Sequence, residues 1–506
     1  MNTDFPLKRI VIVGGGTAGW MSALIIANAL QRHQVEILVI ESPEVGVIGV
    51  GEGSTPILKK FFDTLGIGEQ EWMPECNATY KSGIRFTAWS GKPEHPTYFH
   101  PFATLLDQFT LPTYVAQLQR RLQAQAAEVL PDDYFLSAQL AMRNLAPTEP
   151  ENFPFFSSYG YHFDAGLLGK FLHKKALAMG IHHQACHVVN VTQNQQGAIA
   201  SLQTSTGETL CADFFIDCSG FQGLLINQTL KTRFVSYEQH LFNDAAIALP
   251  SEIDQLIAPQ TTATALKYGW AWKIPLQNRY GNGYVYSSRY TDSTQAETEL
   301  RQHLGLLEAD IPVRHLRMKL GRVEQHWHKN CLAVGLSQGF LEPLEATALY
   351  LMQMTIGIFT LFLERGDLSP AAQAAYNQEI NDYFDGHRNY IIAHYKTTSR
   401  TDTEYWRDNA RGLATIPDSL QRVFEVWLSG QDLAAELQRQ SIDRFYPPTS
   451  WYALLAGMGV FPALETAKQN SATRDQVQDF LRRACLNYRS HQQALADLNL
   501  AGKIAA

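Results

Sequence analysis

The hydrophobic positions of the first forty residues predict a buried strand, a tight turn and a helix. Residues 10–13 are four consecutive aliphatic side chains, which is typical of a parallel strand buried on both faces. Leu24, Ala27 and Leu30 then follow at helical spacing. A second aliphatic run, residues 35–40, predicts a neighbouring strand. The chain therefore opens with the β-α-β order of an α/β protein.

The rest of the chain alternates between predicted strands, helices and loops. Residues 84–89 alternate like a strand. Residues 98–102 predict a loop because Pro101 restricts its neighbour, and the Gly-Asn-Gly run at 281–283 predicts a hairpin turn. Further strands are predicted at 188–191, 199–204, 212–217, 270–275 and 284–286. Helices are predicted at 56–62, 110–145 and 167–178 and from 366 onward, with a loop at 444–452.

Length, charge and cysteine usage indicate a globular protein that handles small molecules. At 506 residues the chain is too long for one small core, which predicts two interwoven lobes. The formal charge of -8 and the lack of a dense Lys/Arg run argue against nucleic acid or an anionic membrane as the main partner. No run of about 18 apolar residues exists to span a bilayer, and the N-terminal segment lacks a signal cleavage site. The six cysteines form no C-x-x-C pair, which predicts buried free thiols in a reducing cytoplasm.

The turn after the first strand has the pattern of a dinucleotide-binding turn. Gly14 provides a tight turn, Gly16 lets the backbone approach a pyrophosphate, and Gly19 lets the helix pack closely on the strand. The amides at the helix start would face the phosphates. Glu41 ends the second strand at about the expected distance for an acid that hydrogen-bonds a ribose.

FAD is favoured over NAD because this pattern stands at the very start of a long chain, while a plain glycine-rich turn is the alternative. Residues 46–56 form a second glycine-rich stretch, which could lie along a flat ligand or be a mobile surface loop. Another glycine of interest, Gly335, ends a strand further along the chain. The predicted cofactor-binding residues are Gly14, Gly16, Thr17, Ala18, Gly19, Glu41, Gly49, Val50 and Gly335.

Three further segments carry candidate chemistry, each with a purely structural alternative. Lys81 stands just before a strand and, taken alone, would be a surface charge. Residues 270–275 put two tryptophans on one face of a strand, which is usual in a core. Glu342 and Glu345 precede a helix that is predicted to begin near Pro343 or Glu345. These acids could merely complement the helix dipole, although amides at such a terminus can also bind an anion.

Together these segments resemble the flavin-dependent halogenases of the tryptophan type. The matching motifs are G-x-G-x-x-G at 14–19, W-x-W-x-I-P at 270–275 and Glu-Pro-Leu-Glu at 342–345. The resemblance implies an α/β, two-lobed fold with an FAD-binding Rossmann-like domain of the flavin monooxygenase type, an interwoven β-sheet and a helical substrate lobe. The implied FAD-binding domain comprises 1–90, 155–230 and 318–365, the substrate-side sheet and helices 91–154 and 231–317, and the helical C-terminal lobe 366–506.

The resemblance also implies a division of labour within the molecule. In the family, free FADH2 and oxygen oxidise a halide, chloride or bromide, to hypohalous acid, which passes through a tunnel to a separate substrate pocket. Lys81 matches the lysine that receives the oxidant, and Glu345 matches the glutamate that faces the substrate. The amides of Thr347 and Ala348 match the halide site. Trp270, Trp272 and Ile274 would line the tunnel, and residues 46–56 resemble the strap between the flavin and halide sites.

The matching substrate positions indicate an aromatic pocket that differs from that of the family. They are Ile84, His100, Phe102, Phe445 and Tyr446. Ala346 replaces the serine that usually follows the second glutamate, and the residues that grip the ammonium and carboxylate of tryptophan have no convincing counterparts. The resemblance therefore implies indole, or a larger indole-bearing or phenolic compound, as substrate, with free tryptophan a poorer one.

Two other functions stay open at this stage. One is a flavin monooxygenase that hydroxylates an aromatic compound, against which the two-tryptophan motif argues. The other is a non-catalytic FAD-binding protein, which would need neither Lys81 nor Glu345. Only one dinucleotide fingerprint is present, so a separate NAD(P)H-dependent flavin reductase is the implied partner.

Overall fold

The first strand, β1 (Arg9–Val13), lies at the centre of a six-stranded sheet. The structure is a computed structural model that describes residues 5–44, 51–150, 152, 156–411, 416–464 and 472–505. Strand β1 pairs in parallel with β12 and β2, which confirms the predicted α/β start. Helix α1 (Thr17–Ala29) packs against α6 (Ala165–Ala178) and α8 (Ala348–Glu364). In order across the sheet, the strands are β20 (Trp327–His328), β21 (Cys331–Ala333), β12 (Phe214–Asp217), β1 (Arg9–Val13), β2 (Glu36–Glu41) and β8 (His182–Ala185).

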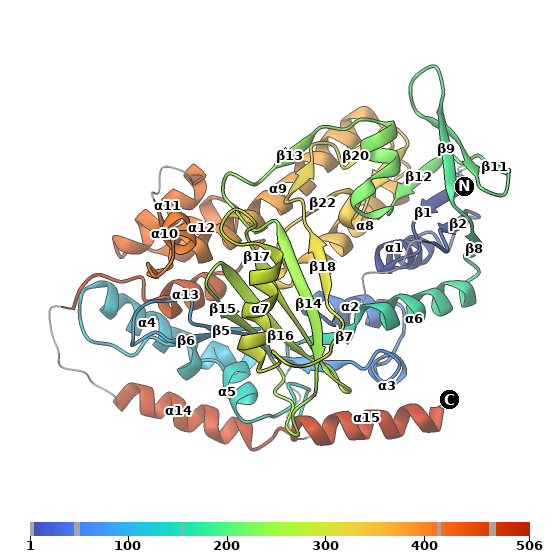
Figure 1. Ribbon diagram of the computed structural model, residues 1–506. Helices are drawn as coiled ribbons and strands as arrows, with labels where there is room; N and C mark the ends of the chain where they lie inside the picture. Colours follow the sequence, from blue (N-terminus) through green and yellow to red (C-terminus); the bar gives the residue numbers. More distant parts are fainter. Residues whose placement is uncertain are drawn as a thin grey trace.

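A seven-stranded, mostly antiparallel sheet occupies the middle of the molecule (Figure 1). Helix α7 (Ser293–Leu304) packs against β14 and β17 on one face. The tryptophans of β16 belong to the main core on the other side. Across the sheet the strands are β18 (Arg314–Arg317), β14 (Ala245–Ser251), β17 (Tyr280–Tyr286), β16 (Gly269–Pro275), β15 (Thr261–Ala265), β5 (Gly83–Thr87) and β6 (Thr97–Pro101).

Three short sheets accompany the larger ones. One carries the segment before β5 and consists of β3 (Gly51–Gly53), β7 (Gly160–Asp164) and β4 (Thr79–Lys81). The second consists of β11 (Thr209–Leu210), β10 (Ile199–Thr204) and β9 (Val188–Gln193). The third consists of β13 (Phe234–Ser236), β19 (Gly321–Val323) and β22 (Gly339–Phe340).

The C-terminal part is helical, as its pattern predicts. Helices α14 and α15 run along one edge of the molecule, and α15 packs against α3 (Figure 1). The remaining helices are α2 (Ile57–Thr64), α3 (Glu69–Trp72), α4 (Leu111–Leu122), α5 (Leu136–Met142), α9 (Pro370–Lys396), α10 (Glu404–Ala410), α11 (Asp418–Leu428), α12 (Leu433–Arg439), α13 (Pro448–Gly457), α14 (Ala472–Cys485) and α15 (His491–Ala505).

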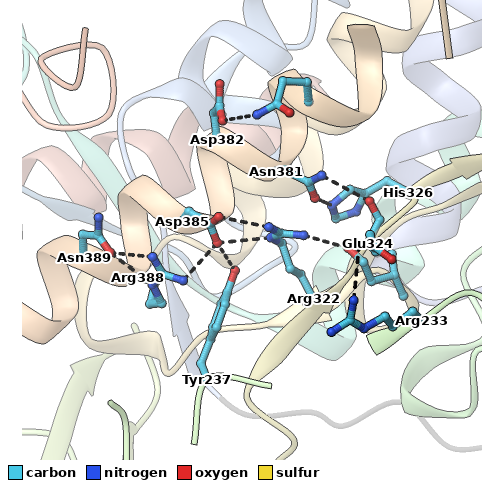
Figure 2. Close-up of polar contacts among 12 residues, drawn as sticks. Arg233, Tyr237, Arg322, Glu324, His326, Asn381, Asp382, Asp385, Arg388 and Asn389 are labelled. Carbon is cyan, nitrogen blue, oxygen red and sulfur yellow. Dashed lines mark hydrogen bonds and ion pairs between the residues drawn. The ribbon is translucent and has the colours of Figure 1, made fainter. Parts of the chain in front are cut away.

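The 27-residue helix α9 is joined to β19 by a partly buried cluster of charged groups (Figure 2). The carboxylate of Asp385 accepts hydrogen bonds from the Arg322 guanidinium at 3.1 and 3.0 Å and from the Tyr237 hydroxyl at 2.6 Å. One turn on, Arg388 also contacts Asp385, at 3.2 Å. Because Arg322 belongs to β19, this cluster ties the middle of α9 to the third short sheet.

One predicted loop and one predicted hairpin turn are in fact strands. Residues 97–101 form β6, which pairs only with β5 at the edge of the sheet, where a proline costs no ladder hydrogen bond. The Gly-Asn-Gly run lies inside β17, and the hairpin turn falls at residues 276–279. These glycines serve close approach: a Cβ at Gly283 would lie 2.0 Å from the Trp272 ring, and one at Gly281 would lie 2.9 Å from the Gly51 backbone.

Three other boundaries also differ from the prediction. The strand at 84–89 ends at Thr87 because Ala88 takes a left-handed conformation, with φ of 60°. The helix expected near Pro343 or Glu345 begins at Ala348, after a separate 3₁₀ turn over Pro343–Glu345. The loop expected over 444–452 gives way to α13 at Pro448, since proline is well suited to the first helical position.

Helical structure over 110–145 is interrupted, since α4 and α5 are separated by residues without helical structure and a short 3₁₀ turn. All six cysteines are free thiols; Cys211 is exposed and Cys218 half-buried, so the expectation of buried thiols is wrong for these two. Among the described helices, none combines the length and apolar character needed to cross a membrane.

Candidate active site

The turn between β1 and α1 has the shape that a dinucleotide needs. Gly14 has φ of 121°, and a Cβ there would lie 2.2 Å from the Cys218 carbonyl oxygen. A Cβ at Gly19 would lie 1.8 Å from the Gly14 carbonyl oxygen, so the helix could not pack here with a side chain. By contrast, a Cβ at Gly16 would meet open space, which leaves the start of α1 accessible to a ligand.

The electrostatics of this turn also suit a pyrophosphate. The first turn of α1, which includes Thr17 and Ala18, holds no acidic residue, so its amides present positive partial charge. Glu41 stands at the carboxyl end of β2, beside this turn. Gly335, with φ of 72°, approaches the Cβ of Ala18. The described residues therefore fit a bound FAD, whereas Gly49 and Val50 lie outside the described residues.

Strand β3 leads from the W-x-W-x-I-P strand to the candidate lysine. A Cβ built on Gly51 would lie 3.5 Å from the Ile274 side chain. A Cβ built on Gly53, two residues on, would lie 3.3 Å from Nζ of Lys81. Trp270 and Trp272 are also buried on β16, with ring centroids 6.2 Å apart. Ile274, one of the predicted tunnel residues, and Lys81 thus lie beside the same short strand.

Lys81 is buried in β4 rather than exposed on the surface. Its side chain has no accessible surface, and Nζ has no hydrogen-bond partner among the described residues. The Phe102 ring is an aromatic neighbour, with its centroid 5.3 Å from Nζ. Burial lowers the pKa of Lys81 to about 7, although the nearby Glu345 carboxylate raises it. The amine can therefore gain or lose a proton near neutral pH.

A chain of hydrogen bonds supports the wall beside Lys81. The Thr79 hydroxyl donates to the Pro275 carbonyl at 2.7 Å, so it accepts from Nδ1 of His162 at 3.0 Å. Burial lowers the pKa of His162 well below its usual value, so the imidazole is neutral and Nε2 accepts from the Thr261 hydroxyl at 2.9 Å. The hydroxyl of Thr261 is thereby held in one orientation beside Gly53.

Glu345 lies between two buried histidines. Nδ1 of His100, on β6, lies 2.8 Å from Oε2 of Glu345, and Nε2 of His394, on α9, lies 2.8 Å from Oε1. All three side chains are at least 94% buried. Each carboxylate oxygen therefore has its own imidazole neighbour, and neither faces bulk water.

Glu342, the first acid of the same turn, holds the tryptophan motif. Its Oε2 accepts hydrogen bonds from Nε1 of Trp270 at 2.8 Å, the Tyr395 hydroxyl at 2.6 Å and the Asn243 amide at 3.0 Å. Glu342 is fully buried, and burial raises its pKa. The W-x-W-x-I-P strand and the Glu-Pro-Leu-Glu turn are therefore joined directly, across 72 residues of sequence.

The predicted halide residues begin helix α8. Thr347 is the N-cap, its side chain caps no amide, and the first turn holds no acidic residue. The first amides of a helix have no intrahelical acceptor, so those at Thr347 and Ala348 can bind an anion. They follow Ala346, whose φ of 55° turns the chain between Glu345 and the helix.

The predicted substrate residues fall into two groups. Ile84 and His100 face each other across β5 and β6, and Phe102 stands beside Lys81. Tyr446 stacks on Tyr390 with ring centroids 3.6 Å apart. The ring centroid of Tyr390 lies 5.9 Å from that of His100.

Phe445 packs instead on α9, where a Cβ at Gly386 would lie 2.2 Å from its ring. Phe445 and Tyr446 share the lining of a small cavity that also contacts α9, α11 and α13. The structure thus brings Ile84, His100 and Tyr446 around Glu345 and leaves Phe445 further out.

Comparison with known proteins agrees with this arrangement of motifs. A family model described as tryptophan halogenase matches residues 9–473. The chain belongs to the tryptophan halogenase family. The tryptophan 6-halogenase SttH of Streptomyces toxytricini is 35% identical, over 94% of each chain. Its crystal structure matches with a TM-score of 0.83, covering 97% of this chain and 99% of that one.

A second halogenase of known structure shows that the likeness is not confined to tryptophan-named enzymes. Xcc4156, a flavin-dependent halogenase from Xanthomonas campestris, matches with a TM-score of 0.83 and 31% identity, covering 97% of this chain and 98% of that one. Membership in the tryptophan halogenase family makes this chain an enzyme, a flavin-dependent halogenase.

Sequence reasoning missed several residues that surround the candidate site of this halogenase. They are His162, Thr261, His394 and Tyr395. Nothing in their spacing distinguishes them from core residues, because His394 follows His387 and Ile391 at the helical spacing of any buried stripe. Only the fold brings them to Lys81, Glu342 and Glu345.

Proposed function

We propose that the chain is an FADH2- and O2-dependent halogenase that oxidises a halide to hypohalous acid and uses Lys81 to direct this oxidant onto an electron-rich aromatic compound. The observation that carries the proposal is the Lys81 ammonium group, fully buried without a partner among the described residues and beside Glu345. Burying a cation without a partner costs folding free energy, so the presence of such a group indicates a functional role.

The chain's own residues supply separate sites for the flavin and the substrate. The turn at Gly14–Gly19 and the acid Glu41 would hold the dinucleotide, and the amides of Thr347 and Ala348 would hold the halide. Bound reduced flavin supplies, with oxygen, the oxidising equivalents for the halide. Trp270, Trp272 and Ile274 are proposed to line the path toward Lys81.

Lys81 and Glu345 would carry the chemistry on the substrate. Protonated Lys81 can donate a hydrogen bond to the hypohalous acid, whereas neutral Lys81 can take the halogen as an N–X bond; a pKa of about 7 allows both. The aromatic carbon then forms the C–X bond, its C–H bond breaks, and the proton passes to Glu345. The O–X bond breaks as the halogen moves to the carbon or to Lys81, and the hypohalous oxygen takes a proton from the Lys81 nitrogen and leaves as water. In the second case the N–X bond breaks when the carbon takes the halogen, and in both cases the proton held by Glu345 returns to the Lys81 amine. The position of the ring relative to Lys81 would decide which carbon reacts.

The pocket suits an indole ring better than a free amino acid. His100, Phe102 and Tyr446 supply aromatic walls, and Ile84 an aliphatic one. No residue predicted here would grip both an ammonium and a carboxylate group. We therefore propose indole or an indole-bearing compound as the substrate, with free tryptophan a poorer one.

The deciding experiment is mass spectrometry of products from the purified protein with FAD, a flavin reductase, NADH, oxygen and chloride or bromide. Indole and tryptophan are offered separately. Halogenated indole, with little halogenated tryptophan, is expected. Halogenated tryptophan at the same rate would contradict the proposed pocket, and a hydroxylated product without halide would contradict the halogenase chemistry.

The variant Lys81→Ala provides the matching control. It should lose halogenation and still bind FAD, because the dinucleotide turn is built by other residues. Full halogenation by this variant would remove Lys81 from the mechanism.

A further inference from the structure

Two consecutive residues of α9 contact the two acids of the Glu-Pro-Leu-Glu turn. His394 lies 2.8 Å from Glu345, and the hydroxyl of Tyr395 lies 2.6 Å from Glu342. Both acids are buried, with 0% of Glu342 and 4% of Glu345 exposed. This end of α9 therefore faces the turn on which the candidate catalytic glutamate stands.

The geometry of the turn explains this pairing. Pro343–Glu345 is a 3₁₀ turn, and Glu342 occupies the position just before it. In 3₁₀ geometry, side chains three residues apart lie on the same side. Glu342 and Glu345 thus project together toward α9. The turn is short and ends at Ala346 with φ of 55°, so it lacks the intrahelical hydrogen bonds that would fix a longer helix. Side-chain contacts must hold Glu345 in place.

Glu342 is held from several directions, whereas Glu345 depends on its two histidines. Three donors converge on Oε2 of Glu342. His100 is hydrogen-bonded to Oε2 of Glu345, whereas Nε2 of His394 lies 2.8 Å from Oε1 as a close polar contact that does not have hydrogen-bond geometry. His100 also lies among the predicted substrate residues, so in the proposed function it would contact the substrate as well as Glu345. His394 is 1% exposed and packs between Phe86 and Tyr390 in a ring-lined pocket.

Helix α9 can hold His394 firmly because it is anchored upstream. Asp385 binds Arg322 and Tyr237 in the cluster of Figure 2. Nine residues later, about 14 Å along a helix, the contacts of His394 and Tyr395 begin. The helix thus connects a rigid charged cluster to the turn that bears Glu345.

We propose that His394 is the positioning residue of Glu345: it keeps the carboxylate facing the substrate pocket, while Tyr395 fixes α9 to the same turn through Glu342. This proposal rests on the proposed function, because it gives Glu345 a role in the chemistry. His394 itself touches neither substrate nor oxidant. The mechanism predicts an effect on the aromatic substitution step and none on the formation of the oxidant.

The test compares His394→Leu with His394→Gln in the full-length halogenase. Leucine removes the polar contact, whereas the glutamine amide can reach the place of Nε2 and donate to Glu345. His326→Leu is the matched control, because it removes another buried imidazole that contacts α9 through Asn381, at 3.2 Å. That contact lies thirteen residues earlier, about 20 Å along the helix.

Kinetics with indole give the first readout. His394→Leu should lower kcat by about 10- to 100-fold, the scale of a misplaced catalytic group, with the KM for indole unchanged. A 1,3-diketone trap should still collect hypohalous acid at the wild-type rate. His394→Gln should recover most of the lost kcat, and His326→Leu should keep the wild-type kcat.

Crystal structures of the wild type and both His394 variants give a readout that does not need activity. The Glu345 carboxylate should keep its place in His394→Gln and rotate in His394→Leu. An unmoved carboxylate, a wild-type kcat in His394→Leu, or equal losses of kcat in the leucine and glutamine variants would overturn the proposal. If the wild type halogenates nothing, the proposed function fails, whereas the position of Glu345 still decides the role of His394.

Discussion

At the scale of single residues, the Lys81 ammonium group is destabilising in its buried place. Its pKa is about 7 in the folded protein and near 10.5 when exposed. The unfolded chain therefore binds this proton more tightly, and the folded state loses stability as pH falls from 10.5 to about 7. Such local cost at a functional site is common, because activity and stability compete there.

Replacing Lys81 with methionine should thus stabilise the protein. We expect a gain of a few kcal/mol at pH 7, since one pKa unit corresponds to about 1.4 kcal/mol. The gain should be constant below pH 7 and vanish above about pH 10.5, where the amine is neutral in both states. Thermal melting across this pH range measures it, with the exposed Lys60→Met as control. A Lys81→Met protein that melts below the wild type at pH 7 would contradict the burial argument.

Glu345 should set the pH dependence of the reaction through Lys81. Its carboxylate raises the pKa of Lys81, so Glu345→Gln should move the limb of the kcat/KM profile that belongs to Lys81 from about 7 to lower pH. The variant should also react about 100-fold more slowly or worse, the usual scale for a positioned acid or base. Steady-state kinetics from pH 5 to 9 provide the measurement. A limb that stays in place or moves to higher pH would show that Glu345 does not raise the pKa of Lys81.

At the scale of elements, helix α9 carries both a structural cluster and a contact with the candidate site. Burial raises the pKa of Asp385, yet Arg322, Arg388 and Tyr237 outweigh it and hold this pKa below the ordinary value of 3.8. A lowered pKa contributes stability above the ordinary value, and that stability is lost as pH falls through the folded-state pKa.

Asp385→Asn should therefore destabilise the protein at neutral pH, by about 1–3 kcal/mol for a partly buried pair. Its difference from the wild type should shrink in acid. Asp382→Asn, on the same helix and more exposed, should change the free energy of unfolding by less than about 0.5 kcal/mol. Denaturant unfolding of both variants at pH 7 and at pH values well below 3.8 tests this. Equal losses in the two variants would show that the Figure 2 cluster is not the anchor of α9.

Helices and strands are predicted correctly where the local sequence pattern determines them. The prediction is wrong where a contact with a distant segment determines them. The β1-turn-α1 unit is confirmed because aliphatic runs and glycines act within twenty residues. Residues 97–101 form a strand because β5 provides an edge that accepts Pro101. The Gly-Asn-Gly run stays extended because Trp272 and the Gly51 backbone fill the space of its missing side chains.

At the scale of the whole molecule, the candidate site is assembled from segments far apart in the chain. Motif resemblance selected Lys81, His100 and Glu345 from positions up to 264 residues apart in sequence, and the fold brings all three together. The same reasoning could not select His394, because a lone histidine on a helix is indistinguishable from core until its neighbour across 49 residues is known. Supporting residues therefore emerge only from three-dimensional contacts.

The whole molecule also determines how reducing power must arrive. One G-x-G-x-x-G turn is present in the sequence, and it follows the first strand of the six-stranded sheet. With that turn proposed for FAD and no second fingerprint for NAD(P)H in the sequence, we expect reduced flavin to come from a separate reductase. We expect no turnover with NADH and FAD alone, and halogenated indole once a flavin reductase is added. Photochemically reduced FAD, supplied with oxygen and halide, should replace the reductase, because diffusion alone delivers the cofactor. Turnover without either source would place an NADH site on this chain, whereas activity with the reductase but not with reduced FAD would require direct contact between the two proteins.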